Sequence, residues 1–421
     1  LDLCKLPRIS EMEAKVFELK NGLRVVYRHI PYTRAVHCGY VINSGSRDDR
    51  EGQQGMAHFI EHMIFKGTSK RKTFHILNYL ESVGGDVNAY TTKEKTCLYA
   101  SLAANYFERA VELLTDITFH STFPEKELDK EKRVISEEID MYRNTPDEAI
   151  FEDFDQMIFP EHSLGDPILG TKDSIRTFTK DHISKHLRSA FTRENVVFGI
   201  VGNVKEKEVE KVIAKYIAPI ELPGGNPVRY QPNLRQEQDL TVANTTEQIH
   251  EIIGGRAFPM QRDLYVPFLL LNNLLGGPAM NSRLNLNIRE KHGLSYSISS
   301  FYTPYLDSGI WGIYFACDPD NLNRIRRLVN KEMKSLVEKP LGVVRLNQAK
   351  KQLQGQLVLG AESLLAQMLG MSQDLLDFGR LTTFAENLNQ IETVSAAQIQ
   401  DAAKMIFQEL PLSRITYRQM A

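Results

Sequence analysis

The sequence contains no long apolar run. No stretch of about 18 residues is continuously apolar, which is the minimum for a membrane-spanning helix. Residues 1–7 also lack the basic stretch followed by an apolar run that defines a signal peptide. They contain no Met either, so we expect that an initiator or a longer leader is missing. We therefore expect no membrane partner, and the lack of an export signal favours a cytoplasmic, bacterial-type location.

An excess of charge of one sign is also missing. The chain has 51 Lys and Arg against 53 Asp and Glu, for a net charge of -2. Nucleic acids and anionic membranes need concentrated basic charge, so we expect neither as a main partner. The hydrophobic share of 42% is enough for a sizeable core, and 421 residues predict more than one domain.

Cysteine is scarce. Only Cys4, Cys38, Cys97 and Cys317 occur, and no two of them form a CxxC pair. This is too few for a disulfide framework and favours a reducing compartment. We expect small buried apolar side chains here, with a catalytic thiol as the weaker alternative.

The order of elements along the chain indicates two similar α+β domains. Asn21-Gly22 is a hairpin signal between two strand patterns, and helical periodicity follows it. In the first half, strands are predicted at 15–19, 24–27, 36–41 and 196–201, and helices at 55–65, 72–82, 104–119 and 125–142. In the second half, strands are predicted at 240–243, 249–254, 296–301, 309–315 and 413–417, and helices at 264–275, 282–291, 321–337, 342–376 and 396–407. The second half thus repeats the order of the first.

A segment rich in helix breakers divides the two halves. Residues 222–227 read Leu-Pro-Gly-Gly-Asn-Pro, which suits neither a helix nor a central strand. We therefore predict a domain at 1–218, a linker at 219–236 and a second domain at 237–421. Each domain is expected to pair a mostly antiparallel sheet with helices.

The motif that carries chemistry is His58-Phe59-Ile60-Glu61-His62. On a helix, His58 and His62 project from one face, and Glu61 shares that face. Two imidazoles four residues apart suit a zinc ion, which also needs a third protein ligand and a water. Glu61 could accept the proton of that water. The alternative is a surface helix with two histidines and an ion-pairing Glu.

The third ligand is expected to be a carboxylate on the helix at 125–142. Glu131 and Glu138 are seven residues apart and share a face, while Glu137 competes but points about a quarter turn away. Acidic residues are also common on any long exposed helix. As a comparison, His182 and His186 have the same spacing but no adjacent Glu, and we interpret them as a solvated helix face.

These residues resemble the pitrilysin/insulinase family, the inverzincins, whose two-domain members include mitochondrial processing peptidase subunits. The family pattern is His-x-x-Glu-His followed about 76 residues later by the last Glu of a Glu-x6-Glu pair. Here His62 and Glu138 are 76 residues apart, and Glu131 begins the pair. The resemblance implies His58, His62 and Glu138 as ligands of one Zn2+ per chain. It also implies Glu61 as the base and Glu131 as a residue that orients a ligand.

The resemblance covers nearly the whole chain. Residues 84–91 are similar to the family's Gly-Gly-x-x-Asn-Ala-x-Thr strand, which implies that the edge strand pairs with the substrate backbone. Its binding residues would be Asn88, Ala89, Tyr90 and Thr91. Residues 289–296 match an Arg-x6-Tyr element, which implies that Arg289 and Tyr296 hold the substrate and stabilise the oxyanion. Without the resemblance, these two would be an ion-paired Arg at a helix end and a Tyr at the core edge.

Two departures limit what the resemblance implies. The second half has no His-x-x-Glu-His and should bind no catalytic metal. The family's glycine-rich loop is short here, at 276–280, which argues against a presequence-receptor role. Family members pair two such two-domain halves, so this chain is expected to form a homodimer or to join a related partner chain. Arg289 and Tyr296 would then serve the zinc of the partner subunit.

The sequence therefore predicts a zinc-dependent endopeptidase acting on peptides or unfolded segments. One alternative is a non-catalytic or partner-dependent subunit, which would be expected to carry a damaged motif. Another is a metal-binding protein without hydrolysis, against which Glu61 argues.

Overall fold

The chain folds into two compact units in the computed structural model, which describes residues 14–226, 228–233 and 236–419. The first unit combines residues up to 139 with 166–229 and 359–385. The second combines 140–165, 230–358 and the residues from 386 onward. The predicted linker at 219–236 contains one boundary, after Arg229, but the chain passes between the units at four further points.

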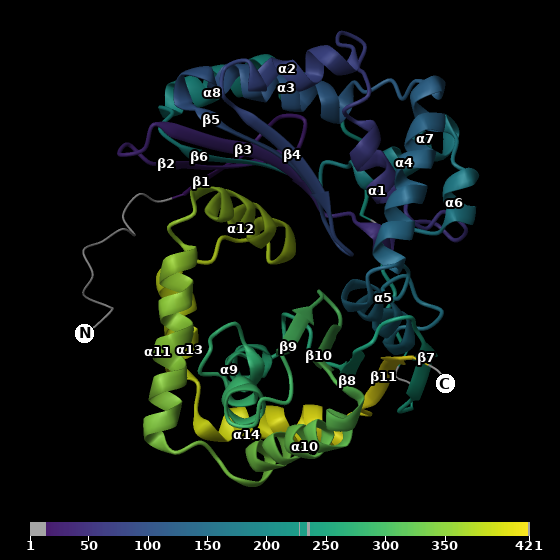
Figure 1. Cartoon of the computed structure of the whole chain (residues 1–421). Helices are drawn as coiled ribbons and strands as arrows, with labels where there is room; N and C mark the ends of the chain where they lie inside the picture. The colour runs from purple at the N-terminus through teal and green to yellow at the C-terminus, as the bar shows by residue number, and fades with distance from the viewer. Residues whose placement is uncertain (1–13, 227, 234–235, 420–421) are drawn as a thin grey trace. The chain divides into compact units, whose positions relative to one another are not determined.

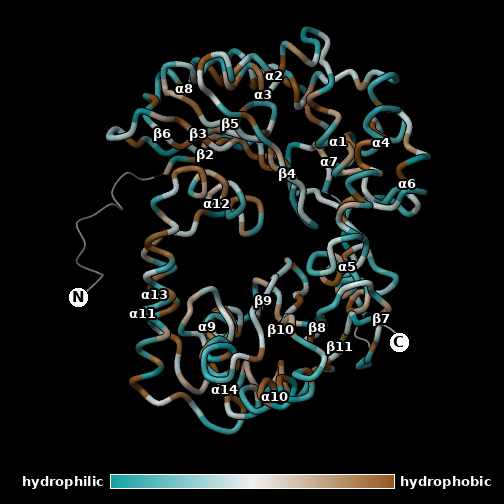
Figure 2. The backbone as a smooth tube through the Cα atoms, in the orientation of Figure 1, coloured by the Kyte–Doolittle hydropathy of each residue, from teal (hydrophilic) through white to brown (hydrophobic). Residues whose placement is uncertain are grey.

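The first unit is built on a six-stranded sheet in the order β1-β2-β6-β3-β5-β4. Neighbouring strands are antiparallel except for β2 and β6, which run parallel. The strands are β1 Lys15–Glu18, β2 Arg24–His29, β3 Ala35–Ile42, β4 Asp86–Thr91, β5 Thr96–Ala103 and β6 Val196–Gly202. The central strands β3 and β6 are strongly apolar (Figure 2) because both of their faces are covered.

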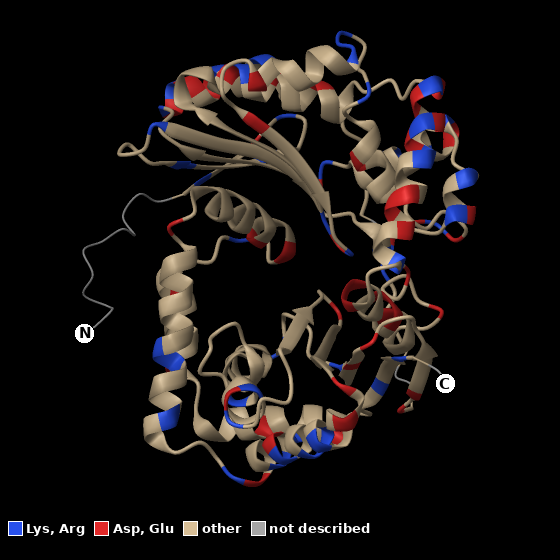
Figure 3. Cartoon of the chain, viewed as in Figure 1, with Lys and Arg blue, Asp and Glu red and all other residues tan. Residues whose placement is uncertain are grey.

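Helices cover both faces of this sheet. On one face, α3 packs on β3 and β5 with α1, α2 and α8 around it, and α12 lies on the opposite face (Figure 1). The helices of this unit include α1 Met56–Met63, α2 Thr73–Glu81, α3 Phe107–Phe119, α6 Lys172–Arg176, α7 Lys180–Ala190, α8 Glu206–Tyr216 and α12 Leu364–Asp377. Acidic and basic residues alternate over α8 and over α4 Glu125–Arg143 (Figure 3).

The second unit repeats this plan with a five-stranded sheet in the order β7-β11-β8-β10-β9. Its one parallel pair, β7 with β11, corresponds to β2 with β6. The strands are β7 Asp239–Ala243, β8 Ile249–Arg256, β9 Ser297–Pro304, β10 Gly309–Cys317 and β11 Ser413–Arg418. The helices are α5 Pro146–Ile158, α9 Tyr265–Gly276, α10 Leu322–Glu338, α11 Val343–Gly360, α13 Phe384–Thr393 and α14 Ala396–Lys404, with α11 and α13 crossing the unit boundaries. The predicted α+β fold of two similar, mostly antiparallel domains is confirmed.

The two halves of the sequence exchange one helix each. Helix α12 belongs to the second half but packs on β6 and β3 of the first sheet. Helix α5 belongs to the first half but packs on β8 and β11 of the second sheet. The compact units therefore differ from the predicted ranges 1–218 and 237–421, because hydrophobic periodicity shows that a helix has a buried face but not which sheet receives it.

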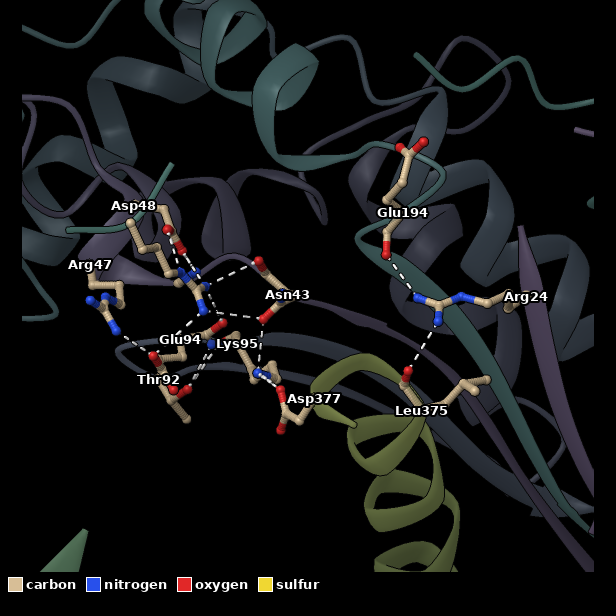
Figure 4. A network of polar contacts seen from close by, with 12 residues as sticks. Arg24, Asn43, Arg47, Asp48, Thr92, Glu94, Lys95, Glu194, Leu375 and Asp377 are labelled. Atoms are coloured by element: carbon tan, nitrogen blue, oxygen red, sulfur yellow. Dashed lines mark hydrogen bonds and ion pairs between the residues drawn. The ribbon is translucent and has the colours of Figure 1, made fainter. Parts of the chain in front are cut away.

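Close contacts fix α12 on its sheet. A Cβ atom on Gly199 of β6 would lie 2.4 Å from Ser372 Oγ and 2.6 Å from Met368 Sδ, so only glycine permits this approach. Two polar contacts add to the packing (Figure 4): Arg24 donates to the Leu375 carbonyl at 3.0 Å, and Lys95 Nζ pairs with Asp377 Oδ1 at 2.6 Å.

The prediction of a single helix at 342–376 was wrong. It is divided into α11 and α12 at residues 361–363. The Ser363 hydroxyl accepts a hydrogen bond from the Ala366 N–H and so begins α12 as an N-cap. Strand β5 and helix α5 were not predicted, although Pro146 in the first turn of α5 is a helix-start signal.

Candidate metal centre

Helix α1 carries the His-x-x-Glu-His motif, and its first turn is held by Asp49. The Asp49 carboxylate accepts hydrogen bonds from the N–H groups of Gly55, Met56 and Ala57 at 2.8–3.0 Å. These are donors that a helix leaves without intrahelical partners, and a carboxylate at this end also suits the helix dipole. Gly55 has φ +92° and lies against the Leu169 carbonyl, which leaves no room for a side chain.

Helix α4 brings two carboxylates toward the motif. Glu131 is buried, Glu138 is half-buried, and Glu137 is exposed. The seven-residue spacing therefore selects Glu131 and Glu138 over Glu137, as the helical geometry predicted. Val134 of the same helix is 47% exposed, because Leu128, Glu131 and Ile135 form the buried stripe.

Three donor groups converge between α1 and α4. One ligand atom from each of His58, His62 and Glu138 lies within 4.8 Å of the other two. Glu138 Oε2 is 3.6 Å from His62 Nε2 and 4.0 Å from His58 Nε2. Donors around a tetrahedral zinc lie roughly 3.3–3.5 Å apart. The two Glu138 distances are thus within several tenths of an ångström of those around such an ion, and all three donors lie close enough for one ion to reach them after side-chain adjustment.

The two histidines are held differently. His62 Nδ1 lies 3.1 Å from Glu131 Oε2, and an ionised carboxylate there would accept a hydrogen bond from the Nδ1–H tautomer. The other ring nitrogen, Nε2, then faces the donor cluster. His58 Nδ1 is buried without a hydrogen-bond partner among the described residues. Burial, with a smaller effect from His62, lowers the pKa of His58 to about 3. His58 is therefore a neutral imidazole at neutral pH, the form that binds a metal.

Glu61 lies in surroundings that raise the pKa of its carboxyl group. Burial raises its pKa above the ordinary value, and the Glu138 carboxylate adds to this rise. The Thr91 hydroxyl and His62 offset part of it, although Thr91 Oγ1 makes no hydrogen bond of regular geometry. A carboxyl with a raised pKa is a better proton acceptor than an ordinary glutamate.

The predicted substrate strand, β4, is an edge strand. It pairs with β5 on one side, and no described strand pairs with its other side. Ala89, Tyr90 and Thr91 are half-buried and Asn88 is exposed. The Asn88 side chain accepts a hydrogen bond from the Ala89 N–H at 2.8 Å. An incoming strand would have to replace this local bond.

Arg289 and Tyr296 belong to the second unit. Arg289 lies in a π-helical turn, Asn285–Glu290, and its side chain is 45% exposed, with Glu290 3.9 Å away. Tyr296 directly precedes β9 and is 87% exposed. Neither side chain is buried in its own unit, so neither has the packing role that a core-edge Tyr or a tightly paired Arg would have.

One interpretation of the histidines was wrong. His186 on α7 is buried rather than solvated, with its Nδ1 3.7 Å from Asp49 Oδ1, and burial lowers its pKa to about 4. The described cysteines, Cys38, Cys97 and Cys317, are buried and unpaired as expected, whereas Cys4 lies outside the described residues. Burial raises the pKa of these three thiols, which makes a catalytic thiol unfavourable.

Two residues of the site were missed from the sequence. Asp49 precedes α1 as an acidic residue near a helix start, which is a recognisable capping signal. Lys66 lies one turn beyond His62, and its Nζ is 2.6 Å from Glu131 Oε1.

No helix among the described residues has the length and apolar character to cross a membrane.

The fold and the site define a two-domain α+β protein with a His-His-Glu set suited to a divalent metal. Two family models match the chain: Insulinase (Peptidase family M16) over residues 24–172 and Peptidase M16 inactive domain over residues 177–353. The chain belongs to peptidase family M16. The segment of the second match contains no His-x-x-Glu-His motif.

Relatives extend over nearly the full chain. An uncharacterized zinc protease, YmxG, of Bacillus subtilis is 34% identical over 94% of this chain and 96% of its own length. An uncharacterized zinc protease of Rickettsia bellii is 32% identical over 95% and 96%. A protease from Helicobacter pylori shares the fold with a TM-score of 0.91 at 19% identity, over 96% of this chain and 99% of that one. A Pseudomonas fluorescens structure described as a peptidase M16 inactive domain has a TM-score of 0.88 at 18% identity, over 97% and 99%.

Proposed function

We propose that this protein is a zinc-dependent endopeptidase that hydrolyses peptides or unfolded polypeptide segments. The observation that carries the proposal is the convergence of His58, His62 and Glu138 donor atoms within 4.8 Å beside Glu61. The relatives named zinc protease support the same activity. His58, His62 and Glu138 would hold one zinc ion per chain.

The residues of the chain have separate tasks in this reaction. When bound, zinc supplies Lewis acidity that makes water a better nucleophile and polarises the scissile carbonyl. Glu61 accepts the proton of the attacking water and later donates it to the leaving amine. The exposed edge of β4 aligns the substrate backbone as an added strand, through the segment from Asn88 to Thr91. No covalent intermediate with the enzyme is required.

The partner proposal concerns Arg289 and Tyr296. Both are exposed in the second unit, and both suit binding of the substrate and its oxyanion. We propose that the chain forms a homodimer, or pairs with a related chain, and that these two residues act on the metal centre of the partner subunit. Exposed Arg and Tyr side chains are typical of contact surfaces.

The activity is tested by peptide hydrolysis with Glu61→Gln, with zinc content measured on the same preparations. Loss of a general base lowers the rate on the order of 10²–10⁴-fold, while the three ligands still bind zinc. Glu137→Gln is the matched control, because this exposed neighbour of Glu138 lies on the same helix. Equal rates for Glu61→Gln and wild type would refute the base assignment.

The partner proposal is tested by mixing inactive Glu61→Gln with inactive Arg289→Ala protein. If the site is shared between subunits, mixed dimers contain one intact site and activity partly returns. No recovery, in a mixture shown by size-exclusion chromatography to exchange subunits, would refute the shared site. An inactive but zinc-loaded wild-type protein would instead favour the alternative of a partner-dependent or non-catalytic subunit.

A further inference from the structure

Lys66 contacts Glu131, which in turn contacts the proposed zinc ligand His62. Its Nζ lies 2.6 Å from Glu131 Oε1, and the other oxygen, Oε2, lies 3.1 Å from His62 Nδ1. His62 and Lys66 are four residues apart, at the end of α1 and just beyond it, whereas Glu131 reaches them from α4. Both oxygens of one carboxylate are therefore engaged, each by a different side chain.

Glu131 needs both partners because it is buried. Only 6% of its side chain is exposed, and an ionised carboxylate in such surroundings is costly unless it is paired and hydrogen-bonded. A neutral imidazole supplies one hydrogen bond but no charge. Lys66 is the cation of this group.

The two histidines differ in how much they depend on such support. The His58 side chain is 10% exposed and is held by packing, with no partner for Nδ1 among the described residues. The His62 side chain is 24% exposed, and its ring orientation depends on the bond to Glu131. A hydrogen bond to the remote ring nitrogen fixes the tautomer and the direction of the ligating one. The position of Glu131 therefore bears on His62 more than on His58.

We propose that Lys66 is a positioning residue that sets the zinc affinity of the centre by holding Glu131 against His62. The inference rests on the proposed zinc site. The site contains three carboxylates, Glu61, Glu131 and Glu138, and Lys66 is the cation that pairs with Glu131. With all three ionised, one Zn2+ and one Lys66 ammonium bring the total charge to zero.

The sign of the effect separates this role from simple charge repulsion. If Lys66 acts only as a positive charge near another cation, its removal strengthens zinc binding. If it acts by fixing Glu131, its removal weakens zinc binding, because His62 loses its fixed orientation. The second effect must also disappear when Glu131 is already replaced.

The experiment measures the zinc dissociation constant of the full chain by competition with a chromophoric chelator. We expect Lys66→Met to weaken binding by about 10-fold, at the lower end of the 10–100-fold typical for partners of metal ligands. Lys66→Arg retains a cation and should bind within about 3-fold of wild type. In a Glu131→Gln background, Lys66→Met should cause no further loss. Circular dichroism of the metal-free variants verifies that each is folded.

Lys130→Met is the matched control, because Lys130 precedes Glu131 on α4 but is exposed and pairs with Glu127 at 2.7 Å. It should leave the zinc affinity unchanged. Unchanged or tighter binding by Lys66→Met, or an equal loss in the Glu131→Gln background, would overturn the proposal. Failure of the proposed function appears differently, as a wild-type chain that binds no stoichiometric zinc or that binds it without hydrolysing peptides.

Discussion

The contact between Lys95 and Asp377 should be among the most sensitive points of the first unit. Lys95 Nζ and Asp377 Oδ1 are 2.6 Å apart, and the two side chains are only 8% and 7% exposed. The Asp377→Asn substitution removes the negative charge opposite the buried Lys95 ammonium, which keeps only neutral acceptors such as the Asn43 side-chain oxygen at 2.9 Å (Figure 4). Breaking a buried pair in this way costs about 3–5 kcal/mol, because one charge stays buried without compensation.

The cost should appear as a lower urea midpoint for unfolding of the first unit, followed by circular dichroism and by proteolysis near α12. Asp181→Asn provides the control, since Asp181 and Lys185 are also 2.6 Å apart but are 66% and 52% exposed. That change should leave the midpoint where it is. The double variant Lys95→Met with Asp377→Leu should recover most of the loss, because a matched apolar pair leaves no buried charge. Similar midpoints for Asp377→Asn and Asp181→Asn would refute the reasoning.

Two further predictions concern packing and pH. Gly199→Val should separate α12 from β6, because even a Cβ atom would lie 2.4 Å from Ser372 Oγ. Overpacking of this kind typically costs about 1–3 kcal/mol of folding stability, which a thermal melt would show as a lower midpoint. Gly355→Val is the control, because a Cβ atom at Gly355 would meet no other atom within 4 Å. His186 stays neutral in the folded state down to about pH 4, whereas the unfolded chain takes up a proton near its ordinary pKa of 6.5. The free energy of unfolding should therefore fall as the pH drops from 6.5 to 4, by about 3 kcal/mol at most, and His186→Gln should lack this part of the decline in urea titrations at several pH values. Parallel pH curves for His186→Gln and wild type would contradict the assigned burial effect.

Spacing along single helices predicted which residues lie close together at the candidate site. His58, Glu61 and His62 depend only on the geometry of one helix, and the seven-residue interval places Glu131 and Glu138 on one face of another. The structure brings these residues close together. The repeat of the two halves was also visible in the order of elements along the chain, and the two sheets share the same plan.

Contacts between distant segments were not predictable in this way. His186 is buried beside Asp49 of a distant segment, and Lys66 meets Glu131 only because α4 lies against the end of α1. The exchange of α5 and α12 was also invisible, because an apolar helix face fits either sheet equally well by composition. The break between α11 and α12 had a local signal, the Ser363 cap, which the long helical periodicity obscured.

The place of α12 in the chain has a consequence for synthesis on the ribosome. The last strand of the first sheet, β6, ends at Gly202, yet the helix that covers its second face starts only at Leu364. Chains emerge and begin to fold from the amino end. Val26, Val197 and Val201, which pack in the clusters around α12, must therefore remain uncovered while residues 203–363 are made. The nascent chain passes through a long interval with a bare apolar sheet face, and this interval is when it most needs a chaperone.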